Sequence, residues 1–143
     1  MIHRNPLLLL GGVLSLAAAL LHLACIVGGP SWYRFLGAGE GTARAAQRGE
    51  WRPTMITLGV AAVLFIWAGY AFSGAGLISR LPILRTGLVV ITGIYLLRGL
   101  VLFRPSMLGR PDLSAAFLFW SSLTVLAIGL IYGVGTWRGW NTL

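Results

Sequence analysis

The stretch that decides the fold is TMITLGVAAVLFIWAGYAFSGAGLIS, residues 54–79, which contains no charged side chain. A helix needs about 20 consecutive apolar residues to cross the hydrocarbon of a bilayer, and this stretch is longer than that. Soluble domains carry a charge on about a quarter of their residues. This chain has 10% charged and 57% hydrophobic residues and a mean hydropathy of +0.85. Its composition is that of an integral membrane protein.

Three further apolar runs surround this stretch, at residues 5–33, 86–97 and 113–137. The outer two are long enough to cross a bilayer, whereas the run at 86–97 reaches that length only by including Arg98. We therefore expect an all-α integral membrane protein, with four transmembrane helices in one bundle domain that covers residues 1–143. The predicted spans lie at about residues 7–28, 54–78, 83–103 and 113–136. An even number of spans puts both termini on one side of the membrane, which we name the near side.

The charged residues are almost all arginines, which account for a net charge of +8 without a single lysine. They flank the apolar runs, and this favours contact with anionic lipid headgroups over binding of nucleic acid. A chain rich in arginine, alanine and glycine is typical of a GC-rich bacterial genome, so we expect a bacterial cytoplasmic (inner) membrane. The number of arginines outside the spans favours a cytoplasmic far side, whereas the charges before the first span favour a cytoplasmic near side. The sequence leaves the side of the termini open.

The first far-side connection is predicted to contain a short helix. It begins with the breaker GGP and places Trp32 at the level of the membrane interface. Glu40, Arg44 and Arg48 follow at a spacing of four, and glutamate before arginine at this spacing stabilises a helix. We expect a helix over about residues 40–49 that lies at the membrane surface. A solvated loop held by its aromatic residues is the alternative.

Polar residues gather at one level of the far-side half of the predicted bundle. His22 and Arg98 each lie about 22 Å along a helix from its near end, at a rise of 1.5 Å per residue. Tyr95 is one turn deeper than Arg98, and the fourth span enters this level from the opposite side. We expect a ligand site here, covered by the first far-side connection. Its predicted residues are His22, Tyr95, Arg98, Glu40, Trp32, Trp120 and Ser121.

Three interpretations of Arg98 remain open, and in one of them the third span ends before Arg98 and leaves it outside. Exposure to lipid at the membrane centre would cost about 2.5–3.5 kcal/mol, so the side chain either snorkels to the far headgroups or turns into the bundle. An inward Arg98 would pair with Glu40 or Glu50, or would hold an anionic ligand group. His22 is either a packing residue bonded to Tyr95 or a serine, or it is a proton carrier or ligand contact.

Small residues at a spacing of four mark positions where membrane helices approach closely. The positions predicted to pack in this way are Gly11, Ser15, Ala19, Gly69, Ser73, Gly129 and Gly133.

Several function classes are disfavoured by what the chain lacks. All three carboxylates lie in far-side connections, whereas proton- and cation-coupled transporters usually have an acid inside the membrane. Cys25 is the only cysteine and there are two histidines, so we expect no disulfide, metal or cofactor. No catalytic residue stands out.

Three segments carry a resemblance to known sequences: LLHLACIVGGPSWYRFLGAGE, WAGYAFSGAGLISRLPILR and IYLLRG. Together they resemble a group of small four-helix membrane proteins predicted from proteobacterial genomes. The resemblance covers most of the chain, and it implies a bacterial membrane protein without transferring a catalytic residue.

The function that these observations favour is a binding or accessory module in the membrane. Its polar pocket would hold a lipid headgroup, most naturally an anionic one, a small amphiphile or a membrane partner protein. One alternative is a homo-oligomeric channel or transporter for a small anion or neutral solute, since four helices are too few for a central pore. Another is an intramembrane enzyme that uses His22 and Arg98.

Overall fold

The computed structural model describes residues 4–143, and every regular element in that part of the chain is a helix. The elements are α1 (Pro6–Gly28), α2 (Pro30–Phe35), α3 (Glu40–Gln47), α4 (Arg52–Gly74), α5 (Leu84–Gly99), η1 (Leu100–Leu102), η2 (Pro105–Leu108) and α6 (Ala115–Arg138). Four of them, α1, α4, α5 continued by η1, and α6, are long and apolar enough to cross a membrane. The prediction of four such helices is confirmed.

Local sequence signals account for where these helices begin and end. Asn5 and Ser114 cap α1 and α6, because their side-chain oxygens accept hydrogen bonds from the Leu8 and Phe117 amides at 3.2 and 3.1 Å. Helix α4 ends at Gly74, four residues before the approximate end predicted for the second span. The chain turns after Gly74, where Gly76 adopts a φ of +74°, which favours glycine.

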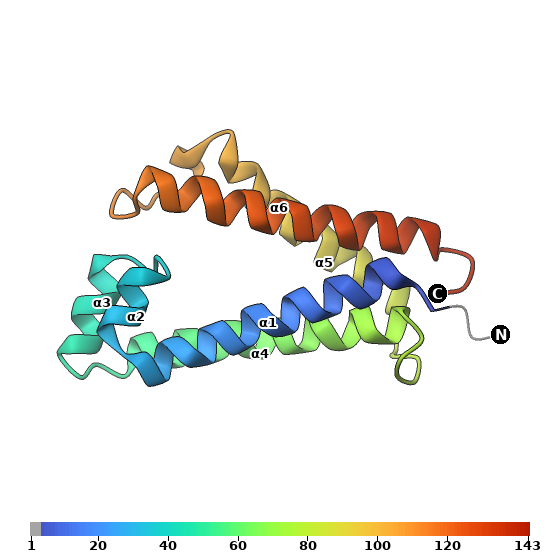
Figure 1. Ribbon diagram of the computed structural model, residues 1–143, viewed down its shortest axis with the longest axis horizontal. Coiled ribbons are helices and arrows are strands. Elements are labelled where there is room, and N and C mark those ends of the chain that lie inside the picture. Colours follow the sequence, from blue (N-terminus) through green and yellow to red (C-terminus); the bar gives the residue numbers. More distant parts are fainter. Residues whose placement is uncertain (1–3) are drawn as a thin grey trace.

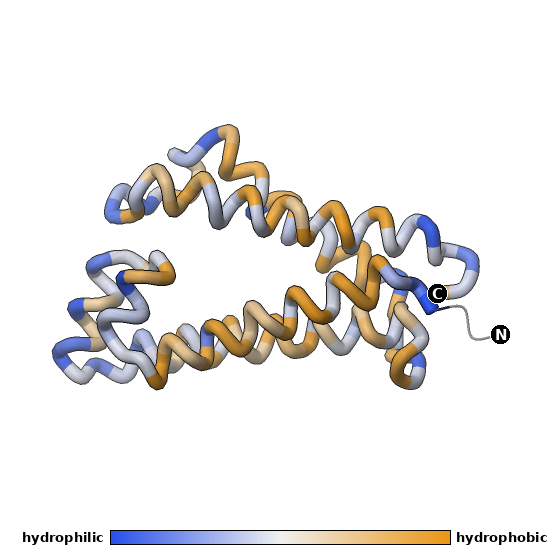
Figure 2. Tube along the Cα trace, viewed as in Figure 1, coloured by the Kyte–Doolittle hydropathy of each residue, from blue (hydrophilic) through white to orange (hydrophobic). Residues whose placement is uncertain are grey.

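The long helices form two pairs, α1 with α4 and α5 with α6 (Figure 1). The pairs meet in one half of the bundle, where the Asn5 side chain donates a hydrogen bond of 2.7 Å to the Gly135 carbonyl. The start of α1 and the C-terminus also lie at this end, which is therefore the near end (Figure 1). Toward the far end the two pairs diverge. Figure 2 shows hydrophobic residues along the four long helices and most hydrophilic residues near the two ends.

The connection between α1 and α4 folds into a small helical unit at the far end. The predicted helix over residues 40–49 is present as α3, and α2 precedes it where only a breaker was expected. Cys25, Tyr33 and Ala43 form a small buried core that joins this unit to α1. The Tyr33 and Thr57 hydroxyls are 3.3 Å apart and hydrogen-bonded, so the unit is also attached to α4.

Candidate functional site

Arg98 turns into the bundle. Its Nη1 donates a hydrogen bond of 2.9 Å to the Ser122 Oγ on α6, and its Nη2 donates one of 3.3 Å to the Ser121 Oγ. Ser122 is fully buried and Arg98 partly so. Of the two orientations open from the sequence, the structure has the inward one, with hydroxyls as its partners.

The direction in which helical side chains lean explains this orientation. A side chain on a helix leans toward the N-terminus of that helix. Helix α5 begins at the near end, so Arg98 leans away from the far end of the bundle. Helix α6 begins at the far end, so Ser121 and Ser122 lean toward the far end and meet the Arg98 side chain. Snorkelling would require the arginine to extend against this lean.

The carboxylates of the chain are paired with other arginines. Glu40 binds Arg34 at 3.0 Å and Arg44 at 3.2 Å, and Glu50 binds Arg48 at 2.7 Å. The pairing of Arg98 with Glu40 or Glu50, one of the two possibilities for an inward arginine, is therefore wrong. The physical reason is that α2 and α3 place arginines of the connection between α1 and α4 beside these two glutamates.

The third carboxylate, Asp112, is bound by Arg110 at 2.9 Å. All three acids of the sequence are thus occupied within the described residues 4–143. The hydrogen bond from Arg34 and then that from Arg44 hold the pKa of Glu40 below its ordinary value, and the one from Arg110 lowers the pKa of Asp112. Arg98 has no carboxylate partner in this part of the chain.

Tyr95 lies in a second polar cluster, deeper in the bundle than Arg98. The Ser15 hydroxyl is 2.7 Å from the Tyr95 hydroxyl and 2.7 Å from the Tyr132 hydroxyl. Tyr132 also donates to the Trp67 carbonyl at 3.2 Å. Rings of Trp67 and Tyr95 pack edge to face, with centroids 4.8 Å apart. The cluster therefore joins side chains from all four long helices.

Tyr132 is the residue of this cluster that the sequence analysis missed. It is the largest fully buried side chain of the described chain. Tyr95 leans toward the near end and Tyr132 toward the far end, because α5 and α6 run in opposite directions. The two hydroxyls therefore meet at Ser15, although the two tyrosines start from different levels. Applying this lean to every tyrosine of the spans would have found the pair.

His22 stays apart from both clusters. Its Nδ1 is 2.7 Å from the Ala18 carbonyl of its own helix and donates a hydrogen bond to it. The bond to Tyr95 or a serine that one interpretation predicted is therefore wrong, because the tyrosines engage Ser15, which lies about two turns further from the far end than His22. The ring is partly buried.

The two tryptophans predicted for the site lie toward its outside. Trp120 is 64% exposed and packs edge to face on Phe119, with ring centroids 5.3 Å apart. Trp32 is 43% exposed and its indole covers Gly28. Ser121 is therefore the predicted α6 residue that the structure brings to Arg98, while Trp120 points away from it.

Most of the predicted packing positions lie in helix contacts. Ser15 and Ala19 are fully buried, and a Cβ on Gly11 would come within 2.8 Å of the Tyr132 ring. Gly129 and Gly133 face α5 in the same way, and the Ser73 hydroxyl accepts a hydrogen bond from the Leu81 amide at 2.9 Å. Gly69 differs, since no atom lies within 4 Å of the position its Cβ would take.

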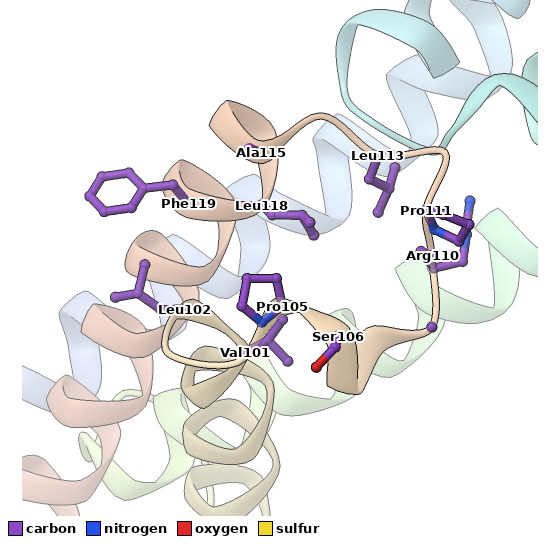
Figure 3. A pocket seen from close by; sticks show the side chains of 11 residues that line it. Val101, Leu102, Pro105, Ser106, Arg110, Pro111, Leu113, Ala115, Leu118 and Phe119 are labelled. Atoms are coloured by element: carbon purple, nitrogen blue, oxygen red, sulfur yellow. The ribbon is translucent and has the colours of Figure 1, made fainter.

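A cavity of about 520 Å³ opens at the far end of α5 and α6 (Figure 3). Its walls come from η1, η2, the loop that follows and the first turns of α6. Its lining is apolar apart from Ser106 and Arg110. Val101 follows Arg98 by one turn of helix and Leu118 precedes Ser122 by one turn, so the cavity lies one turn beyond the Arg98 contacts.

No group of three or more metal-ligating side chains occurs among residues 4–143. The arrangement around Arg98 offers a cation with neutral hydroxyl neighbours, which is suited to holding an oxyanion. Comparison of the chain with protein-family models, with curated proteins and with solved structures gave no match.

Proposed function

We propose that this protein is an integral membrane binding module that holds an anionic lipid headgroup at Arg98, in the far half of the bundle. The observation that carries the proposal is the unbalanced charge of Arg98. Its hydrogen-bond partners are the neutral hydroxyls of Ser121 and Ser122, and the carboxylates of the chain bind other arginines. A charge in this position is expensive unless it is paired.

The guanidinium has donors left for such a group. Arginine carries five N–H donors in a planar fork that matches a phosphate, and the two serine contacts use only two of them. Ser121 and Ser122 fix one side of the fork. The partly buried guanidinium can therefore donate to an oxyanion from its other side, and the bond would be charge-assisted.

The membrane location is part of the proposal. It is supported by four helices of sufficient length and hydropathy, by large exposed apolar side chains along them, and by arginines at both ends. The arginine-only basic composition and the resemblance to small proteobacterial membrane proteins support a bacterial cytoplasmic membrane. In this arrangement both termini lie on one side and α3 lies at the opposite surface.

The experiment is lipid retention by the purified protein in phosphatidylcholine nanodiscs that contain a minor fraction of phosphatidylglycerol. Native mass spectrometry measures the phosphatidylglycerol that stays bound. We expect Arg98→Gln to reduce retention by about tenfold, which corresponds to about 1.4 kcal/mol and lies near the usual worth of a hydrogen bond to a charged group. Arg80→Gln, which removes an exposed charge at the near end, should leave retention unchanged.

Other outcomes separate the alternatives. Inorganic phosphate could displace phosphatidylglycerol from the wild type and have no such effect on Arg98→Gln. That result would identify the site as one for a free anion. A second protein could instead copurify with the wild type and not with Arg98→Gln, while no phosphatidylglycerol is bound. The group held by Arg98 would then be a carboxylate of that partner and not a lipid headgroup. Equal retention by Arg98→Gln and Arg80→Gln would refute the proposal.

A further inference from the structure

The cavity at the far end of α5 and α6 has a different chemistry from the Arg98 site. Val101 and Leu102 of η1 and Leu118 of α6 line it, together with Pro105, Pro111 and Leu113 from the connection between α5 and α6 (Figure 3). Its volume of about 520 Å³ is within the range of small-molecule sites, about 300–1,000 Å³. The cavity is thus large enough for a ligand and built almost entirely of apolar walls.

The single charged residue in the wall does not make the cavity an ion site. Arg110 donates to both carboxylate oxygens of Asp112, at 3.0 and 2.9 Å, and to the Ala38 carbonyl at 2.7 Å. Its charge is therefore neutralised by Asp112, and its Nη2 also donates to the α2–α3 unit. Ser106 is the other polar wall residue.

The position of the cavity indicates where its occupant comes from. It lies where two helices that are long and apolar enough to cross a membrane reach their far ends. Large apolar side chains continue from it onto the outer surface, since Phe103 is 74% exposed, Met107 68% and Phe119 48%. Exposed apolar side chains therefore lie on or next in sequence to residues that line the cavity.

We propose that this cavity binds an acyl chain of a bilayer phospholipid, which enters from the far leaflet and packs between η1, η2 and the start of α6. The lining has no free charge to select a headgroup, so the site recognises the chain. The occupant fills the space under the connection between α5 and α6 and supports its fold. This inference depends on the membrane location proposed above and not on Arg98.

A pair of adjacent alanines makes the test selective. Ala115 lines the cavity and Ala116 does not, and both are exposed in the first turn of α6. A tryptophan at position 115 fills the cavity, whereas one at position 116 adds the same bulk outside it. Neither substitution removes a buried side chain, so both variants are expected to fold.

The probe is phosphatidylcholine with a photoreactive diazirine in one acyl chain, mixed into phosphatidylcholine vesicles that contain the protein. After irradiation, mass spectrometry locates the labelled residues. We expect labelling of residues 101–119 above that of other lipid-facing segments, a fall of about fivefold or more in Ala115→Trp, and wild-type labelling in Ala116→Trp. A fivefold change corresponds to about 1 kcal/mol.

Equal labelling of residues 101–119 in the two tryptophan variants would overturn the proposal. Labelling of that segment no higher than of other lipid-facing segments would also overturn it. Absence of labelling along the whole chain would instead contradict the membrane location. A fall in labelling that appears in Arg98→Gln as well would show that the two sites are one.

Discussion

The hydroxyls of Ser15 on α1 and Tyr132 on α6 lie 2.7 Å apart in the interior of the bundle, and both residues are fully buried. Ser15 bonds Tyr95 at the same distance, so one small hydroxyl joins the two helix pairs. Hydrogen bonds between membrane helices contribute about 0.6 kcal/mol on average and up to about 1.7 kcal/mol.

Ser15→Ala is therefore expected to lower the free energy of unfolding by about 1–2 kcal/mol, because the Tyr95 hydroxyl loses its only partner among the described residues. Detergent unfolding followed by circular dichroism measures this change. Ser31→Ala is the control, since that serine is exposed and its contact to the Gly28 carbonyl is 3.5 Å long. A loss no greater than that of the control would show that the buried cluster adds nothing to stability.

Two glycines of α5 test how closely this helix approaches α6. A Cβ at Gly99 would lie 2.7 Å from the Leu126 Cα, whereas one at Gly93 would meet nothing within 4 Å. We expect Gly99→Ala to destabilise the bundle by about 1–3 kcal/mol, since the neighbouring backbone must shift. Gly93→Ala should stabilise it by about 0.5–1 kcal/mol through helix propensity. Thermal unfolding in the same detergent compares them, and the opposite order would refute the α5–α6 packing.

The α2–α3 unit should respond to acid through Glu40. Its pKa lies below the ordinary value of 4.5 because Arg34 and Arg44 bind the carboxylate. A carboxyl whose pKa is lower in the folded state adds stability that is fully present above the unfolded value and is lost as pH falls through the folded value. The contribution should therefore persist at neutral pH and disappear only below about pH 4.5.

An NMR titration of the Glu40 carboxyl carbon follows this group directly. Arg34→Gln should move its midpoint upward, toward 4.5, and high salt should do the same to a smaller degree. A midpoint that does not respond to Arg34→Gln would show that the pair seen between Arg34 and Glu40 is not formed in solution.

Arg110 links the two helix pairs at the far end, where they otherwise diverge. Its Nη2 donates to the Ala38 carbonyl, and the Phe117 ring packs over Gly37 beside it. We expect Arg110→Ala to broaden the distance distribution between spin labels placed on α3 and on the first turn of α6. Arg104→Ala removes an exposed arginine of the same connection and should leave the distribution unchanged. If both variants match the wild type, this contact does not hold the pairs together.

The sequence could predict the four long helices because charge-free runs of this length allow few other structures. It could also predict that Arg98 and Ser121 share a level, since depth follows from the rise per residue. It could not predict which atoms meet. Depth was counted at Cα positions, whereas the hydroxyls of Tyr95 and Tyr132 lie about one helical turn from the Cα atoms of these residues, in opposite directions.

Two other features depended on information that a linear pattern does not contain. The pairing of Glu40 with Arg34 requires the turn between α2 and α3, which brings residues six apart into contact. The far-end cavity requires the path of residues 103–114, and no periodicity in that segment specifies it. Both are consequences of irregular backbone, for which neither a period of 3.6 residues nor hydropathy gives a rule.

The division of the bundle into α1–α4 and α5–α6 has a consequence for biogenesis. Each pair consists of spans that follow one another in the chain, so the first hairpin can associate while the second is still being synthesised. Docking of the finished hairpins then depends on the near-half contacts around Ser15 and Tyr132. Two halves of the chain, divided between residues 75 and 83 and expressed as separate polypeptides, should therefore reassemble, and Ser15→Ala should weaken that reassembly.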